Sequence, residues 1–266
     1  MPERAATAER LSGGLYLVAT PIGNARDITL RALDVLAAAD AIAAEDTRVT
    51  RRLLDIHGLK APQIIRYDEH AAERARPELM RRLAAGEAIA LATDAGTPLV
   101  SDPGYRLVRE AIAAGVRVTP IPGASAPLAA LALAGLPSDR FLFAGFPPTR
   151  SGQRKRWLAE LAVAPATLIF FENVKRLESS LADMAEVLGD REACVGRELT
   201  KLHEEARRGL LSDLARHYRE AGPPKGEATV VVGPPLAAEA PTADEVDALL
   251  RDLLAEMSVK DAARAA

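Results

Sequence analysis

The chain has 266 residues, of which 48% are hydrophobic and 27% are charged, and its formal net charge is −3. This composition excludes a disordered or low-complexity chain, because such chains lack the apolar residues that offset the entropy lost on folding. The single cysteine, Cys194, excludes an intramolecular disulfide framework and a multi-cysteine metal site. No apolar run approaches the ~20 residues that span a bilayer, and the N-terminus lacks the apolar core of a signal peptide. We therefore expect a soluble cytoplasmic protein without membrane contact.

The net charge is distributed unevenly along the chain. Residues 1–135 carry 16 basic and 16 acidic side chains, residues 136–235 carry 15 and 14, and residues 236–266 carry 3 and 7. An acidic total ordinarily argues against a nucleic-acid partner. Because the whole deficit lies in the last segment, the rest of the chain is close to neutral and retains local basic clusters.

The first half alternates between short apolar runs and longer segments with helical periodicity. The runs predict strands at 15–20, 41–46, 63–68, 88–94 and 117–122, and the periodic segments predict helices at 27–39, 47–57, 71–85 and 105–114. We expect Asp27 to cap the first helix, and Gly58, Gly86 and Gly115 to end helices in the left-handed conformation. Nearly apolar strands that alternate with helices indicate a parallel sheet covered on both faces.

In the second half, predicted strands and helices no longer alternate regularly. Strands are predicted at 141–146, 166–172, 192–198, 204–209 and 226–233, and helices at 153–163, 175–188 and 211–221. Because some strands follow one another directly, a mixed sheet is expected. Prolines 234, 235 and 241 bound a linker, and Thr242 is expected to cap a final helix at 244–257. The predicted division is an N-terminal α/β domain at 1–130, a C-terminal α/β domain at 131–235, and a linker with a partial helical tail at 236–266.

The loops that follow the predicted parallel strands are the first candidates for a ligand site, because ligands bind beyond the carboxyl ends of such strands. These loops, at 20–24, 45–48, 68–70, 94–104 and 122–126, are rich in Gly, Pro, Asp, Ser and Thr. The long polar loop after Asp94 is typical of a functional loop, although each glycine alone is also explained by ordinary turn chemistry. Two nucleotide-binding motifs are absent, because neither a Gly-x-Gly-x-x-Gly motif nor a P-loop follows a strand. The four histidines lack metal-ligand spacing, so we expect no metal.

Several of these segments, in this order, resemble one known family. They are 15–24, 27–29, 44–48, 94–104, 122–126 and 197–201. The chain resembles the 16S ribosomal RNA cytidine 2′-O-methyltransferases, which belong to the tetrapyrrole methylase superfamily of class III S-adenosylmethionine-dependent enzymes. The resemblance implies two α/β domains with S-adenosylmethionine in the cleft between them, a homodimer, and a substrate in the 16S rRNA of the small ribosomal subunit. It further implies that the cofactor contacts Pro21, Asp94, Gly96, Thr97, Ser125, Ala126, Phe171 and Gly226.

The chain departs from this family in three places. Asn173-Val174-Lys175-Arg176 replaces the usual Ser-Pro-His-Arg, and Asp68 replaces a histidine in the third-strand loop. The family tail usually continues into a helix-turn-helix-like region, whereas this sequence stops within that region.

The implied reaction is an in-line attack of a ribose 2′-hydroxyl on the sulfonium methyl group. Because the cofactor brings a good leaving group, the protein must chiefly align the reacting atoms. A general base, or a cation that stabilises the alkoxide, would assist. The candidates are Asp46, Glu198 and Lys201. A helix cap for Asp46, and a surface ion pair for Glu198 and Lys201, are alternative roles.

Basic side chains near the cleft are candidates for phosphate contacts. Arg150, Arg154, Lys155 and Arg156 flank Ser151-Gly152, and Arg48 opens the second predicted helix. A solvated helix face is the alternative interpretation.

Two other functions are also considered. A tetrapyrrole methyltransferase acting on porphyrin precursors shares the fold, but usually has Gly-x-Gly-Pro-Gly-Asp-Pro after the first strand, where this chain has Pro21-Ile22-Gly23-Asn24. A non-catalytic RNA-binding factor is the other alternative, and the intact loop at 94–104 argues against it.

Overall fold

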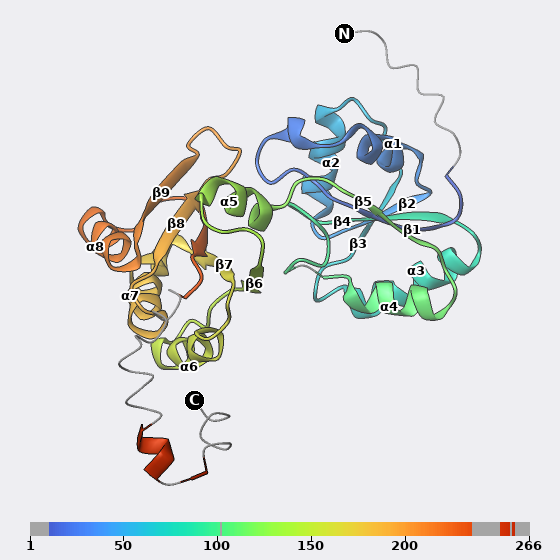
Figure 1. Ribbon diagram of the computed structural model, residues 1–266. Helices are drawn as coiled ribbons and strands as arrows, with labels where there is room; N and C mark the ends of the chain where they lie inside the picture. The colour runs from blue at the N-terminus through green and yellow to red at the C-terminus, as the bar shows by residue number, and fades with distance from the viewer. Residues whose placement is uncertain (1–10, 102, 236–250, 256, 259–266) are drawn as a thin grey trace.

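The computed structural model describes residues 11–101, 103–235, 251–255 and 257–258. Two α/β units lie side by side, and each is built on a five-stranded sheet (Figure 1). The first sheet has the strand order β3-β2-β4-β1-β5 and is parallel throughout. Its strands are β1 (Gly14–Val18), β2 (Ala41–Ala44), β3 (Gln63–Arg66), β4 (Ala88–Ala92) and β5 (Val118–Ile121).

Helices cover both faces of the first sheet. Successive side chains of a strand point to opposite faces, and here both sets are apolar and pack against helices. Tyr16 and Val18 pack against α1 (Leu30–Ala38) and α2 (Thr47–Ile56). Leu15 packs on the other face, with α3 (Ala72–Ala84) and α4 (Tyr105–Ala113).

The strand order creates a topological switch point between β1 and β4. The chain leaves β1 toward helices on one face of the sheet and leaves β4 toward a helix on the other face. The two loops therefore diverge at neighbouring strand ends and leave a crevice, which is where open α/β sheets bind ligands.

The second sheet has the order β6-β7-β10-β8-β9 and is mixed: β6 and β7 are parallel and the other neighbours are antiparallel. One face packs against α6 (Ser151–Leu161), α7 (Leu177–Leu188) and α8 (Leu211–Ala221), and the other against α5 (Ala126–Ala134). The strands are β6 (Phe141–Gly145), β7 (Thr167–Asn173), β8 (Glu192–Arg197), β9 (Glu205–Leu210) and β10 (Glu227–Val232).

The predicted pair of α/β domains, one with a parallel and one with a mixed sheet, is confirmed, and one local expectation is corrected. The cap of α1 is Thr29, whose side chain accepts a hydrogen bond from the Ala32 backbone N–H, whereas Asp27 ends the short 3-10 helix η1 (Ala25–Asp27). The helix α5 was not predicted. It packs on the second sheet and includes residue 130, where the sequence predicts the division between the two domains.

The expected final helix at 244–257 lies mostly outside the described residues. Within this range, residues 251–255 are described and are helical. None of the helices that the structure describes has the length and apolar character needed to cross a membrane. Within the described ranges, no group of three or more His, Cys, Asp or Glu side chains is arranged to hold a metal ion.

Candidate functional site

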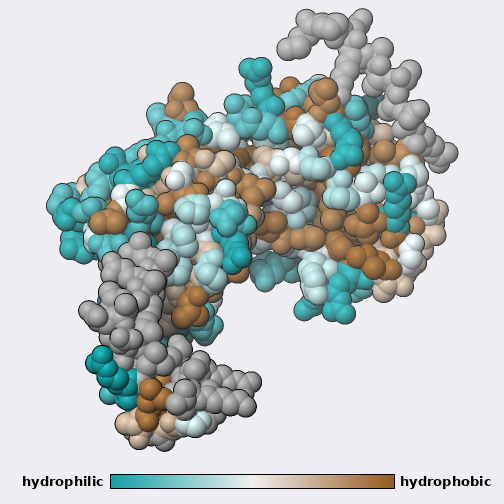
Figure 2. All heavy atoms as spheres, in the orientation of Figure 1, coloured by the Kyte–Doolittle hydropathy of each residue, from teal (hydrophilic) through white to brown (hydrophobic). Residues whose placement is uncertain are grey.

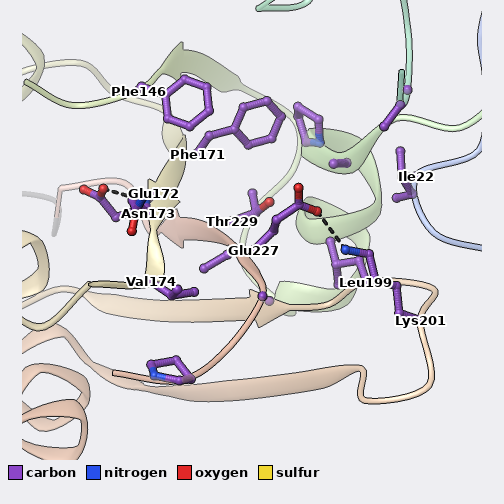
Figure 3. Close-up of a pocket in the computed structure, with 18 of the residues that line it drawn as sticks. Ile22, Phe146, Phe171, Glu172, Asn173, Val174, Leu199, Lys201, Glu227 and Thr229 are labelled. Carbon is purple, nitrogen blue, oxygen red and sulfur yellow. Dashed lines mark hydrogen bonds and ion pairs between the residues drawn. The ribbon is translucent and has the colours of Figure 1, made fainter. Parts of the chain in front are cut away.

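A cavity of about 760 Å³ opens between the two units. The loops after β1 and β4 line one side, and the start of α5 with the ends of β7, β8 and β10 lines the other. In Figure 3, Ile22 lies on one side of this cavity, and Asn173 and Val174 lie on the opposite side. On the face shown in Figure 2, hydrophobic side chains gather where the two units meet. The cavity thus lies at the switch point between β1 and β4, and the second unit forms its other side.

Backbone pairing fixes the wall that the first unit contributes. The backbone N–H of Thr20 donates to the carbonyl of Gly96 at 2.9 Å, and Gly96 N–H donates back at 3.0 Å. Gly96 has a φ of 84°, which favours glycine. The Thr97 hydroxyl donates to the Ala124 carbonyl at 3.1 Å, so the loop after β4 is tied to the segment that enters α5. This wall is therefore a fixed backbone surface.

The second unit contributes an apolar wall backed by a buried carboxylate. Phe171 lines the cavity, and the next residue, Glu172, is 3% exposed. Its carboxylate accepts hydrogen bonds from Arg176 at 2.7 Å and from the Asn173 backbone N–H at 2.7 Å. These bonds hold the turn that contains the short 3-10 helix η2 (Val174–Arg176), which places Val174 and Lys175 in the wall.

Lys201 supplies a fixed positive charge at the cavity. Its Nζ donates to Glu198 Oε1 at 2.9 Å. It also donates to Glu227 Oε2 at 2.8 Å (Figure 3). Burial alone lowers the pKa of Lys201, but the hydrogen bonds to Glu227 and Glu198 outweigh burial and raise the pKa above its ordinary value. The bond from Lys201 in turn holds the pKa of Glu198 below its usual value. Lys201 is thus an ammonium and Glu198 a carboxylate at neutral pH.

The turn that carries Lys201 depends on an unusual backbone. Glu198 and Thr200 have φ values of 50° and 65°, in the left-handed region. Gly226, with a φ of 96°, lies so close that a Cβ there would be 2.2 Å from Glu198 Oε1. Glycine at 226 therefore makes room for the carboxylate that holds Lys201.

The same turn contacts the first unit. The backbone N–H of Asn24 donates to Thr200 Oγ1 at 3.1 Å. A Cβ at Gly23 would lie 2.5 Å from Lys201 Cγ. The loop after β1 and the turn after β8 are therefore docked without a gap.

Asp46 and Asp94 lie beside the cavity and do not line it. Asp46 caps α2 by accepting from the Arg48 backbone N–H at 2.8 Å, and its carboxylate also pairs with the Arg48 guanidinium at 2.6 Å. The side-chain hydrogen bond from Arg48 lowers the pKa of Asp46 far below its ordinary value. Asp94 Oδ1 accepts from the Asp46 N–H at 2.9 Å and ties the β2 and β4 loops together.

Most of the residues predicted from the sequence come together here. Six of the eight predicted cofactor contacts line the cavity, as does Lys201, while Pro21, Asp94 and Glu198 are neighbours of lining residues. The six are Gly96, Thr97, Ser125, Ala126, Phe171 and Gly226.

Sequence reasoning missed Phe146 and Asn173, which also line the cavity. Each lies at or directly beyond the cavity end of a strand of the second sheet. Extending the rule for loops after parallel strands from the first sheet to β6 and β7 would have found Phe146 and Asn173.

The structure contradicts the expectation that Arg154 contacts RNA. Arg154 is 2% exposed, and its guanidinium forms an ion pair of 2.6 Å with Asp183. Two further hydrogen bonds go to the carbonyls of Pro148 and Thr149, at 3.2 Å each. Arg154 therefore joins α6, α7 and the preceding loop inside the second unit.

The other predicted RNA contacts remain at the surface. Arg150 and Arg156 are exposed, and neither forms an ion pair with any described residue. Lys155 pairs with Glu186 at 2.6 Å, and Arg48 is exposed but pairs with Asp46. The cationic surface of α6 is therefore smaller than the sequence indicates.

The fold and the cleft define a two-domain α/β protein with a ligand site between its domains. Residues 14–215 match the family model described as Tetrapyrrole (Corrin/Porphyrin) Methylases. A protein of Mesorhizobium japonicum named Ribosomal RNA small subunit methyltransferase I is 58% identical over 257 residues, covering 96% of this chain and 87% of that protein. A protein of Escherichia coli O157:H7 with the same name is 44% identical over 259 residues, covering 97% and 90%. The chain belongs to the tetrapyrrole methylase family.

Solved structures agree with this fold. The methyltransferase CobJ superposes with a TM-score of 0.63 at 20% identity, covering 86% of this chain and 98% of that one. Uroporphyrin-III C-methyltransferase from Thermus thermophilus, complexed with S-adenyl homocysteine, superposes with a TM-score of 0.58 at 21% identity, covering 83% and 97%. At these identities the likeness shows the two-domain architecture.

Proposed function

We propose that the protein transfers the methyl group of S-adenosylmethionine to the 2′-hydroxyl of a cytidine ribose in the 16S rRNA of the small ribosomal subunit. The observation that carries this proposal is the interdomain cavity with Lys201 fixed at its wall, in a chain 58% identical to a ribosomal RNA small subunit methyltransferase I over nearly its full length. We expect the reaction in the cytoplasm and the active form to be a homodimer.

The cavity fits the cofactor in size and chemistry. Its 760 Å³ lies within the ~300–1,000 Å³ typical of cofactor and drug-sized pockets. The first turn of α5, at Ser125-Ala126-Pro127, opens into the cavity and has no side-chain cap. Pro127 has no N–H, and the backbone N–H of Ala126 at the start of this helix suits the carboxylate of the methionine moiety. Phe171 and the backbone at Gly96 and Gly226 suit the flat and apolar parts of the cofactor.

The three candidate catalytic residues differ in what they can do. S-adenosylmethionine supplies the electrophilic methyl group. Asp46 is engaged as a helix cap and ion-pair partner, which makes it a weak base. Glu198 is likewise a weak base, and its role is to hold Lys201. The Lys201 ammonium has three N–H groups, of which two are used by Glu198 and Glu227. No third partner of this ammonium is found among the described residues, so its third N–H can stabilise the ribose oxygen as negative charge develops on it. In this step the O–CH3 bond forms, the S–CH3 bond breaks to leave S-adenosylhomocysteine, and the hydroxyl proton passes to solvent water.

Methyl transfer to purified small ribosomal subunits, to free 16S rRNA and to porphyrin precursors tests the proposal. We expect incorporation into ribosomal RNA and, after digestion to nucleosides, a 2′-O-methylcytidine. Methylation of porphyrins alone would replace the proposal with a tetrapyrrole methyltransferase. Binding of ribosomal RNA without binding of S-adenosylmethionine would replace it with a non-catalytic RNA-binding factor.

A further inference from the structure

The side chain of Phe146 is a solvent-exposed aromatic ring at the edge of the cavity. It lies directly after β6, lines the cavity, and is 59% exposed. A large apolar side chain in solvent forgoes the free energy of burial, so such exposure at a cavity mouth marks a surface that another molecule covers.

The ring of Phe146 is supported from behind. Its centroid lies 5.3 Å from that of Phe171 at an interplanar angle of 55°, and Phe171 lies 4.9 Å from Phe143 in an edge-to-face arrangement. Figure 3 shows the Phe146 and Phe171 rings together at one end of the cavity. Because β6 and β7 are paired strands of one sheet, the three rings are held in place before any ligand arrives.

Two cations accompany this ring. Arg150 follows Phe146 by four residues and is exposed, and Lys175, also exposed, lines the cavity from the end of β7. Neither forms an ion pair with any residue that the structure describes. Arg154 and Lys155, which follow Arg150 on α6, are already paired with carboxylates. Arg150 and Lys175 are therefore the cations available to an anionic ligand.

An exposed aromatic ring that serves as a stacking platform and exposed cations, of which Lys175 lines the same cavity as Phe146, are the groups with which proteins bind unpaired RNA. Bases of single strands stack on aromatic side chains, and basic side chains contact the phosphates. We propose that Phe146 stacks against an unpaired base of the RNA strand that presents its ribose to the cavity, while Arg150 and Lys175 contact the phosphates that flank this base. This inference rests on the proposed function. It implies that this base is unpaired where it meets the protein, because a base must leave its own stack to pack against an aromatic side chain.

Phe146→Ala tests the platform, with Phe141→Ala as the matched control. Phe141 is the first residue of β6, the strand that Phe146 follows, and it is 45% exposed but does not line the cavity. We expect Phe146→Ala to weaken 16S rRNA binding by roughly 5- to 150-fold, with S-adenosylmethionine affinity within about twofold of wild type. Phe146→Tyr and Phe146→Trp keep a stacking face and should retain the affinity for RNA. Phe141→Ala should leave the affinities for both ligands unchanged.

The phosphate contacts are tested separately by salt dependence. Arg150→Gln and Lys175→Gln should each reduce the slope of log Kd against log salt by about 0.7, the value for one phosphate on a single strand. Unchanged slopes would remove the two cations from the proposal.

Two results would overturn the platform. Wild-type affinity for RNA in Phe146→Ala would show that no base stacks there, and a parallel loss of S-adenosylmethionine binding would assign the ring to the cofactor. If the wild-type protein methylates ribosomal RNA in the same preparations, only the platform is refuted. If the wild type neither binds nor methylates RNA, the proposed function fails with it.

Discussion

The substitution Gly23→Ala probes how closely the two domains are docked. A Cβ at this position would lie 2.5 Å from Lys201 Cγ, 2.8 Å from Thr200 Oγ1 and 3.0 Å from the Leu199 carbonyl oxygen. The Lys201 side chain has some freedom to move, but the carbonyl oxygen belongs to the backbone of the turn after β8. The loop after β1 and this turn must therefore separate by several tenths of an ångström.

The cost of the substitution should appear in cofactor binding. Overpacking of this kind costs ~1–3 kcal/mol. Because the clash lies between domains, opening the cleft relieves it without unfolding either domain. S-adenosylmethionine contacts both walls in the proposed complex, so its affinity should fall by roughly 5- to 140-fold.

Isothermal titration calorimetry with S-adenosylmethionine measures this loss, and urea denaturation checks that the free energy of unfolding is preserved. Gly209→Ala is the control, since a Cβ on β9 meets its nearest neighbours at an ordinary 3.9 Å. An affinity of Gly23→Ala within twofold of wild type, in a folded protein, would refute the docking of these two loops.

Three further predictions follow from individual side chains. Arg154→Met removes the 2.6 Å ion-pair partner of the buried Asp183 carboxylate and leaves it only Lys155 at 3.6 Å and the Ser151 hydroxyl at 3.0 Å, so it should lower the free energy of unfolding by ~3 kcal/mol in urea titrations; a loss of RNA affinity at unchanged stability would instead restore Arg154 as a phosphate contact. Lys201→Met should reduce single-turnover methyl transfer by about 10²- to 10³-fold at unchanged S-adenosylmethionine affinity; an undiminished rate would exclude the ammonium from catalysis. Burial, together with the nearby Asp94 charge, raises the pKa of Glu45 above 4.5, so its ionisation destabilises the folded state as pH rises through that range. The melting temperature of Glu45→Gln should therefore exceed that of the wild type at pH 7 by more than it does at pH 4, and an equal difference at the two pH values would contradict the assigned cause.

The features best predicted from the sequence are those fixed by local backbone chemistry. Gly58, Gly86 and Gly115 follow α2, α3 and α4 with φ values of 66°, 83° and 71°, as expected for residues that end helices. The alternation of strands and helices predicted the parallel sheet. Since that sheet fixes where its loops meet, the cavity wall at Gly96 and Thr97 was predictable too.

What escaped prediction depends on tertiary contacts. The nine residues of α5 are all Ala, Leu or Pro, so no polar face marks it as a helix. Thr29 and Asp27 both precede the apolar segment of α1, and nothing local chooses between them as the cap. Arg154 precedes the buried Leu158 by four residues, which places both on one helix face. The cluster of basic residues around Arg154 nevertheless favoured an exposed RNA contact.

The connection between the first sheet and α5 is the short segment at 122–125, and the two walls of the cleft belong to different domains. A ligand that touches both walls binds only a chain in which both domains are folded and docked, so its binding free energy is shared between them. At a free concentration 100 times its Kd, such a ligand adds about 2.7 kcal/mol to the stability of that state. In a calorimeter, two domains that can melt independently should then melt as one cooperative unit.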